Sequence, residues 1–154
     1  MTYNIYIAGP LFSEAELEFN LKLDEFLANI GFHTFLPQRD GYELSELISE
    51  SLDKEKAGKM IFSKDLDEIK KADIIVFIMD GRVPDEGACV EIGLGFAYGK
   101  ECIGLKTDSR TFMDNSDNPM LSGVLKGRIA SSFSELELLL EPYIKLKEEI
   151  CCIC

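Results

Sequence analysis

The segment Asp73-Ile-Ile-Val-Phe-Ile-Met79, followed by Asp80-Gly-Arg-Val-Pro-Asp-Glu-Gly-Ala-Cys-Val-Glu-Ile-Gly93, carries the strongest structural signal in the chain. Its first part is continuously apolar, which is typical of a strand buried on both faces of a parallel sheet. Its second part begins as an acidic loop and continues into a helix predicted over residues 85–98. In an open α/β sheet, a loop at the carboxyl end of a strand forms the ligand crevice. We therefore expect the functional site at this loop.

The same alternation of strand and helix extends along the whole chain. Apolar runs predict further strands at residues 4–7, 32–36, 102–105 and 128–133. Amphipathic patterns predict helices at residues 44–52, 61–72, 120–125 and 134–149, the last capped by Ser134 and Glu137. A further helix should follow the capping box of Ser13 and Glu16 and end near Gly31. The charged residues 54–59 are expected to form a connection, and residues 38–41 a polar loop.

This pattern predicts one α/β domain over residues 1–150, followed by a cysteine-rich tail at residues 151–154. The domain should be doubly wound, like flavodoxin and Rossmann folds, with a mostly parallel five-stranded sheet. Right-handed crossovers place the loops after the first four strands at one edge of that sheet. A site at this edge would combine aromatic, amide and carboxylate side chains.

Composition and charge narrow the classes of partner. The 154 residues suffice for one domain with its own core, and 46% of them are apolar, unlike a disordered chain. The net charge of −12 argues against nucleic acid and anionic membranes, because phosphate binding needs a basic surface. The start of the sequence lacks a signal-peptide pattern, and no apolar run approaches the ~20 residues of a membrane helix. A small neutral or cationic ligand is expected.

The five cysteines predict a reducing environment. Their odd number and the lack of spaced pairs argue against a disulfide framework, so we expect a cytoplasmic protein. The tail Cys151-Cys152-Ile153-Cys154 permits two sharper interpretations, a thiolate metal site or C-terminal prenylation. The single histidine and the missing polybasic run disfavour both, and a frayed helix end is the simpler interpretation. We expect neither a metal nor a cofactor.

Acidic residues of the crevice loop and its helix are the first candidates for chemistry: Asp80, Asp85, Glu86 and Glu91. Carboxylates without a nearby lysine suit proton transfer or attack on a cationic carbon better than phosphate binding. From spacing alone, Glu91 is as readily a solvated helix residue as a catalytic one, and Asp80 as readily a turn residue. Gly93 and Gly95 cost about 1 kcal/mol each in a helix relative to Ala, which indicates close packing or a ligand there.

Six further segments carry a family resemblance: Tyr6-Ile-Ala-Gly-Pro-Leu-Phe12, Asp65-Leu-Asp-Glu-Ile-Lys-Lys-Ala-Asp73, Pro84-Asp-Glu-Gly-Ala-Cys-Val-Glu91-Ile-Gly, Ala97-Tyr-Gly-Lys100, Asp108-Ser-Arg110 and Asn118-Pro-Met120. Together with Asp80-Gly81, and in this order and spacing, they resemble the nucleoside 2-deoxyribosyltransferase family. Each segment alone is a weak signal, and the combination is specific. The resemblance covers residues 3 to about 125.

The resemblance implies a glutamate nucleophile, and Glu91 matches it. The implied reaction cleaves the N-glycosidic bond of a 2′-deoxynucleoside and moves the deoxyribosyl group to the glutamate, then to a second base or to water. Asp85 matches the aspartate that contacts the base and is the candidate general acid, which requires a raised pKa. Asp65 matches the aspartate that contacts the sugar, and Tyr6 matches a tyrosine that hydrogen-bonds the glutamate.

The resemblance also implies the substrate-binding positions. Gln38 matches the polar residue that reads the base edge, and Leu11 and Phe12 would pack against the base. Asn118 resembles an asparagine that reaches the sugar from a neighbouring subunit, which implies a homodimer or larger homo-oligomer with shared sites. The remaining substrate-binding positions within the matching segments are Gly9, Asp80, Gly87 and Met120.

Two alternatives to the transferase remain open. One is a 2′-deoxynucleoside 5′-monophosphate N-glycosidase, a hydrolase that would need cations near Asn118, where Asp114 and Asp117 oppose a phosphate. The other is a non-catalytic nucleotide-binding module on the same fold. The acidic surroundings favour a nucleoside over a nucleotide.

Overall fold

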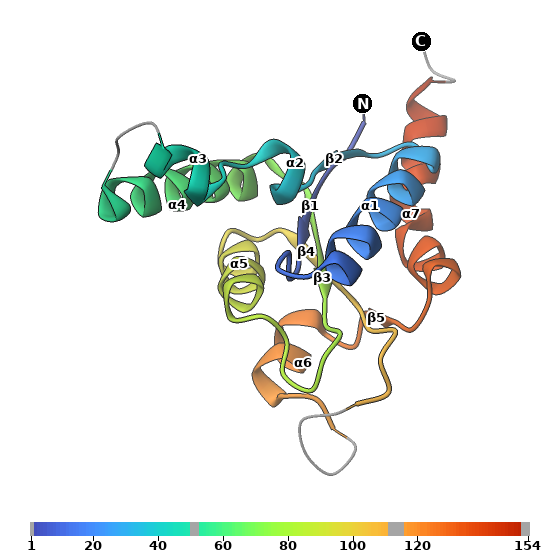
Figure 1. The fold of residues 1–154 in the computed structure, drawn as a ribbon. Coiled ribbons are helices and arrows are strands. Elements are labelled where there is room, and N and C mark those ends of the chain that lie inside the picture. The colour runs from blue at the N-terminus through green and yellow to red at the C-terminus, as the bar shows by residue number, and fades with distance from the viewer. Residues whose placement is uncertain (1, 50–52, 111–115, 152–154) are drawn as a thin grey trace.

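The computed structural model describes residues 2–49, 53–110 and 116–151 and shows one sheet between two layers of helices (Figure 1). The strand order is β2-β1-β3-β4-β5, and all four pairings are parallel. The strands are β1 (Asn4–Ala8), β2 (His33–Phe35), β3 (Ile74–Ile78), β4 (Glu101–Leu105) and β5 (Ile129–Ala130). The prediction of a doubly wound α/β fold with a five-stranded sheet is confirmed.

Helices connect these strands and cover both faces. They are α1 (Glu14–Asn29), α2 (Pro37–Asp40), α3 (Leu44–Ser49), α4 (Lys54–Lys71), α5 (Glu86–Ala97), α6 (Pro119–Leu125) and α7 (Phe133–Cys151). In Figure 1, α1 and α7 lie on one side of the sheet, and α4, α5 and α6 lie on the other. The α3–α4 pair extends beyond the sheet as an arm. No helix within the described ranges is long and apolar enough to cross a membrane.

Alternation along the strands separates two cores. Ile5 and Ile7 of β1 pack with Leu23 of α1, whereas Tyr6 of the same strand packs toward Ile92 of α5. Successive side chains of a strand point to opposite faces, so β1 sends its one tyrosine into the α4–α5 layer. The neighbouring helix α5 approaches the sheet closely at Gly95, where a Cβ would lie 2.6 Å from Ile75 Cγ1. Of Gly93 and Gly95, whose cost in a helix indicated close packing or a ligand, this contact explains Gly95.

The arm differs from the prediction. Residues 54–59 are the first turns of α4 and not a connection, because Asp53 caps the helix by accepting a hydrogen bond from Lys56 N at 2.9 Å. Lysine and glutamate are good helix formers, and Glu55 pairs with Lys59 one turn later. The predicted polar loop 38–41 is largely the short helix α2, which begins with Pro37 at its first position. The helix predicted at 44–52 ends at Ser49, and residues 50–52 lie outside the described ranges.

The C-terminal helix begins earlier than predicted. Ser132 Oγ accepts a hydrogen bond from Glu135 N at 3.3 Å, so the capping residues stand two positions before the predicted Ser134 and Glu137. Glu135 in turn accepts from Ser131 N at 2.8 Å. The predicted strand at 128–133 is only Ile129–Ala130, because this capping begins immediately after it. Of the cysteine-rich tail, residues 152–154 lie outside the described ranges.

Candidate active site

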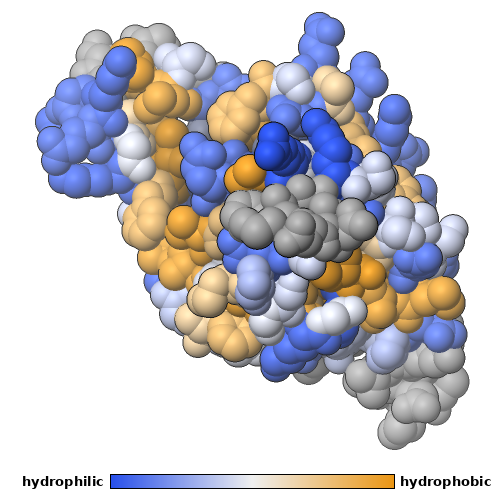
Figure 2. Space-filling model, turned by 90° about the horizontal axis from the view of Figure 1, so that it is seen from below, coloured by the Kyte–Doolittle hydropathy of each residue, from blue (hydrophilic) through white to orange (hydrophobic). Residues whose placement is uncertain are grey.

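A cavity of about 1100 Å³ opens at the carboxyl edge of the sheet, between the arm and α5. Figure 2 views the molecule from this side and shows apolar atoms gathered along the inner side of the arm. Eight of the predicted site residues line the cavity: Gly9, Leu11, Phe12, Gln38, Asp65, Asp85, Gly87 and Glu91. They come from four separate segments of the chain, which the parallel topology brings to one edge.

Tyr6 and Glu91 meet at the wall of this cavity. The Tyr6 hydroxyl donates a hydrogen bond to Glu91 Oε1 at 2.6 Å. The tyrosine is fully buried, and its ring stacks on Phe35 with a centroid distance of 5.3 Å. Burial, followed by the charge of Glu91, raises the pKa of Tyr6 above its ordinary value. The hydroxyl therefore keeps its proton and acts as a fixed donor to the carboxylate.

Glu91 is a partly buried acid beside other acids. Burial raises the pKa of Glu91 to about 7, and the charges of Asp65 and Asp85 add to the increase. The Tyr6 hydrogen bond opposes them by stabilising the ionised form. No described residue other than Tyr6 forms a hydrogen bond with this carboxyl group. One oxygen is held by the tyrosine, and the other is available to a ligand.

Asp65 completes the acidic wall from α4. Burial raises its pKa to about 6, against the opposing effect of Lys64. The residue lines the same cavity as Glu91, which the family resemblance implied and its spacing on a charged helix did not. Two neighbouring carboxyls with raised pKa values in a cleft are typical of a functional site.

Asp85 stands where the loop meets α5. It is the N-cap of the helix, and its Oδ2 accepts a hydrogen bond from Ala88 N at 2.8 Å. The bond fixes the side chain at the cavity wall. Of the four acids that the loop and its helix offered as candidates, Asp85 and Glu91 line the cavity together with Asp65, whereas Asp80 and Glu86 do not.

Comparison with known proteins identifies the family. The family model described as nucleoside 2-deoxyribosyltransferase matches residues 5–135. The chain belongs to this family. No curated protein matches the chain significantly in sequence. The resemblance drawn from the sequence segments is confirmed.

Several solved structures have the same fold. A conserved protein from Enterococcus faecalis V583 is 28% identical with a TM-score of 0.72, covering 96% of this chain and 99% of that one. A 2-deoxyribosyltransferase from Bacillus psychrosaccharolyticus is 24% identical with a TM-score of 0.69, over 87% and 90% of the two chains. A CMP N-glycosidase from Clostridium botulinum is 19% identical with a TM-score of 0.54, over 90% and 98%.

Asp80 lies outside the cavity of this deoxyribosyltransferase-family protein. Its carboxylate accepts hydrogen bonds from Thr107 N and Thr107 Oγ1, both at 2.6 Å, and from Asp108 N at 2.9 Å. Three donors from the loop after β4 therefore hold the end of β3. These hydrogen bonds give Asp80 a structural role at the end of β3, and the residue does not line the large cavity.

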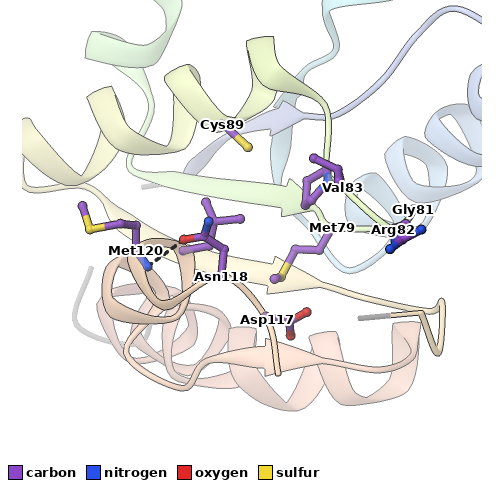
Figure 3. A pocket seen from close by; sticks show the side chains of 10 residues that line it. Met79, Gly81, Arg82, Val83, Cys89, Asp117, Asn118 and Met120 are labelled. Carbon is purple, nitrogen blue, oxygen red and sulfur yellow. Dashed lines mark hydrogen bonds between the residues drawn. The ribbon is translucent and has the colours of Figure 1, made fainter. Parts of the chain in front are cut away.

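Asn118 and Met120 also lie apart from the acidic cavity of the same chain. They line a smaller pocket of about 310 Å³ with Met79, Val83 and Cys89, among others (Figure 3). Asn118 caps α6, and its Oδ1 accepts a hydrogen bond from Met120 N at 2.9 Å. Within one chain, these two residues and the acids do not meet.

The sequence interpretation missed most of the arm's contribution. Tyr42, Leu44, Ile48 and Ile61 also line the cavity and supply an apolar wall. Their apolar spacing was visible in the sequence, but it predicts burial of a helix face and not its use as a ligand wall. In the described part of the chain, no group of three or more His, Cys, Asp or Glu side chains could hold a metal ion.

Proposed function

We propose that this protein transfers the 2-deoxyribosyl group of 2′-deoxynucleosides between nucleobases, through a covalent intermediate on Glu91. The hydrogen bond from Tyr6 to Glu91 at the wall of the large cavity carries this proposal. It holds one carboxylate oxygen in place while the other stays available for attack. Membership of the nucleoside 2-deoxyribosyltransferase family supports the same chemistry.

The proposed reaction has two displacements. In the first, the available oxygen of Glu91 bonds to the anomeric carbon, and the electron pair of the N-glycosidic bond leaves with the base. Asp85 protonates the departing base, and a second base then displaces Glu91 and returns its proton to Asp85. A carboxylate stabilises the oxocarbenium-like transition state, and two inversions retain the anomeric configuration.

The surrounding groups suit these roles. With a pKa of about 7, Glu91 is ionised in a large share of molecules near neutral pH, and a cationic sugar beside it stabilises this ionised form. We expect Asp65, which lines the same cavity from α4, to accept hydrogen bonds from the sugar hydroxyls. The apolar wall of the arm would cover the base and exclude water, which favours transfer over hydrolysis.

The charge of the cavity favours a nucleoside over a nucleotide. Its lining contains the acids Glu43, Asp65, Asp85 and Glu91 and a single cation, Lys54, among the described residues. An anionic 5′-phosphate would be repelled by this excess of carboxylates. The similarity to a CMP N-glycosidase keeps hydrolysis of a 5′-monophosphate as the second candidate.

We further propose a homo-oligomer with shared sites. Asn118 and Met120 lie away from their own chain's acids, and Met120 is 77% exposed. Placed against the cavity of a second copy, they would reach the sugar as the family resemblance implies. We also propose that the substrates are small nucleosides, that the reaction needs no cofactor and that the protein is cytoplasmic.

Covalent trapping tests the reaction. Incubation with a 2-fluoro-2-deoxynucleoside should add the mass of the fluorosugar to the peptide that contains Glu91, and Glu91→Gln should remain unlabelled. A second incubation pairs deoxyinosine with adenine, and a third supplies a deoxynucleoside 5′-monophosphate alone. Formation of deoxyadenosine supports the transferase. Base release from the nucleotide alone, without an exchange product, would show the hydrolase, and binding without turnover would show a non-catalytic module.

A further inference from the structure

Asn20 is a polar residue inside the core, on the face of α1 next to the site. It is 2% exposed, and among the described residues no other amide-bearing or charged side chain is buried to this degree. Its Nδ2 donates hydrogen bonds to Pro10 O and to Gln38 Oε1, both at 2.8 Å. Gln38 Nε2 donates onward to Leu17 O at 3.0 Å. A single chain of hydrogen bonds therefore links the loop after β1, α1 and α2.

The backbone carbonyls at the two ends of this series of hydrogen bonds determine the orientation of both side-chain amides. Pro10 O and Leu17 O are backbone carbonyls, which only accept hydrogen bonds. The Asn20 atom beside Pro10 O must therefore be the nitrogen, and the Gln38 atom beside Leu17 O must also be the nitrogen. The Gln38 atom facing Asn20 is then the oxygen. Both amide orientations follow from the carbonyls alone, although amide oxygen and nitrogen are otherwise easily interchanged.

The arrangement leaves Asn20 incompletely satisfied. Its Oδ1 is buried and has no hydrogen-bond donor among the described residues. An unpaired buried acceptor destabilises a fold, and a leucine at this helix position would avoid that. Packing alone therefore does not explain an asparagine at this position. The hydrogen bond from its Nδ2 to Gln38 does.

Gln38 keeps one donor and one acceptor for a ligand. Its side chain lines the large cavity. After the bonds to Asn20 and Leu17, one Nε2 hydrogen and one lone pair on Oε1 remain. An amide with both groups can pair with the edge of a nucleobase in a bidentate manner.

We propose that Asn20 is a positioning residue that locks Gln38 in one orientation, so that the site distinguishes amino from oxo nucleobases. The inference rests on the proposed function in one respect, that the cavity binds a nucleobase. Adenine and cytosine present an exocyclic N–H donor beside a ring nitrogen acceptor. Hypoxanthine and uracil present an exocyclic oxygen beside a ring N–H. A freely turning amide fits both patterns, whereas a locked amide fits one.

The size of the effect follows from the hydrogen bonds involved. A bidentate amide pair discriminates between bases by about 5- to 150-fold. Removing the Asn20 bond takes away about one hydrogen bond that holds the orientation, so the preference should fall by about 5-fold. The bond from Gln38 to Leu17 O remains, so the preference should not disappear.

The test measures dissociation constants of free bases by calorimetry, in the pairs adenine with hypoxanthine and cytosine with uracil. The proteins are wild type, Asn20→Leu, Gln38→Met, the double variant and the exposed control Asn29→Ser on the same helix. The wild type and the control should prefer one member of a pair, and Asn20→Leu should reduce that preference. In the Gln38→Met background, Asn20→Leu should change nothing further, because the residue acts through Gln38.

Two results would overturn the inference. One is an unchanged preference in Asn20→Leu, and the other is a wild type with no preference in either pair. Failure of the proposed function has a different signature. If the wild type binds bases selectively but turns over neither nucleosides nor nucleotides, the proposed transferase activity is wrong. The role of Asn20 in base preference is still supported in that case.

Discussion

Asp80 and Glu91 stand at the two ends of one strand–loop–helix connection, and the protein treats them in opposite ways. Asp80 accepts three hydrogen bonds from Thr107 and Asp108 and lies outside the large cavity. Glu91 accepts one, from Tyr6, and lines that cavity. Burial and neighbouring acids raise the pKa of Glu91 to about 7.

The contrast separates an acid that holds a loop in place from the acid that we propose as the nucleophile. At Asp80, three donors from the loop after β4 surround the carboxylate. Glu91 is placed where the ionised form is disfavoured until a positive charge arrives. A count of acids in the loop could not show this difference, because both residues have the same chemistry in isolation.

The largest expected effect is at Glu91. Glu91→Ala should lower the transfer rate by more than about 10⁴-fold, as for removal of a catalytic nucleophile. The measurement is the initial rate of deoxyinosine and adenine exchange, with circular dichroism to verify the fold. If Asp80→Ala, measured in the same assay, lowers the rate as much, the proposed difference between Asp80 and Glu91 is wrong.

Asp85→Asn should have the next largest effect. Asparagine is as good an N-cap as aspartate, so α5 should keep its start while the proton donor is lost. The rate should fall by about 10²- to 10⁴-fold for ordinary bases, as for loss of a general acid. A base that leaves readily as an anion should lose far less. An equal loss for both kinds of base would argue against Asp85 as the acid.

Tyr6→Phe sharpens the account of Glu91. A hydrogen bond to a charged group contributes about 1.5 kcal/mol or more, so the rate at pH 7 should fall by about 10-fold. In the wild type, kcat/KM should rise with pH through about 7 as Glu91 ionises. Without the tyrosine hydroxyl, the pKa of Glu91 moves higher. The rise of kcat/KM with pH should therefore occur at higher pH. The control is Tyr3→Phe, because the ring of Tyr3 packs against Tyr143 in the other core. This substitution should leave the rise of kcat/KM at the same pH.

The smallest effects are on stability, and they should have opposite signs. Asp80→Ala loses three hydrogen bonds and should lower the free energy of unfolding by about 1–3 kcal/mol. Glu91→Gln should raise it by a similar amount at pH 8. The folded pKa of Glu91 lies above the ordinary 4.5, so the native state loses stability as pH rises from about 4.5 through 7.

Urea unfolding at pH 4 and pH 8 checks this pair. At pH 4 the carboxyl of Glu91 is protonated in both states, and the gain from Glu91→Gln should vanish. A stabilisation that persists at pH 4 would assign the effect to packing and not to the buried charge. Loss of stability in both variants would remove the distinction between the two acids.

Much of the fold was predictable because its signals are local. The apolar run of β3, the capping box of α1 and the N-cap of α5 each depend on a few neighbouring residues. The errors fell where local signals compete. Residues 54–59 were interpreted as a connection because they are charged, although lysine and glutamate favour a capped helix.

The candidate site was predictable mainly through the family resemblance. Spacing along α5 placed Asp85 and Glu91 near each other, and the structure brings both to one cavity. Spacing gave no reason to bring in Asp65 from α4 or the hydroxyl of Tyr6 from β1. Asn20 was overlooked, although an asparagine on the apolar face of a helix is a visible anomaly.

The sequence by itself determined the order of strands and helices, the parallel sheet and the edge at which the site lies. Periodicity and chain connectivity suffice for these, because each depends on residues close together or on the handedness of crossovers. Only the tertiary structure decided which acids share a cavity, which acid holds the loop after β4 and which asparagine donates a hydrogen bond to Gln38. Those properties depend on desolvation and on distances of a few ångströms between elements far apart in the chain.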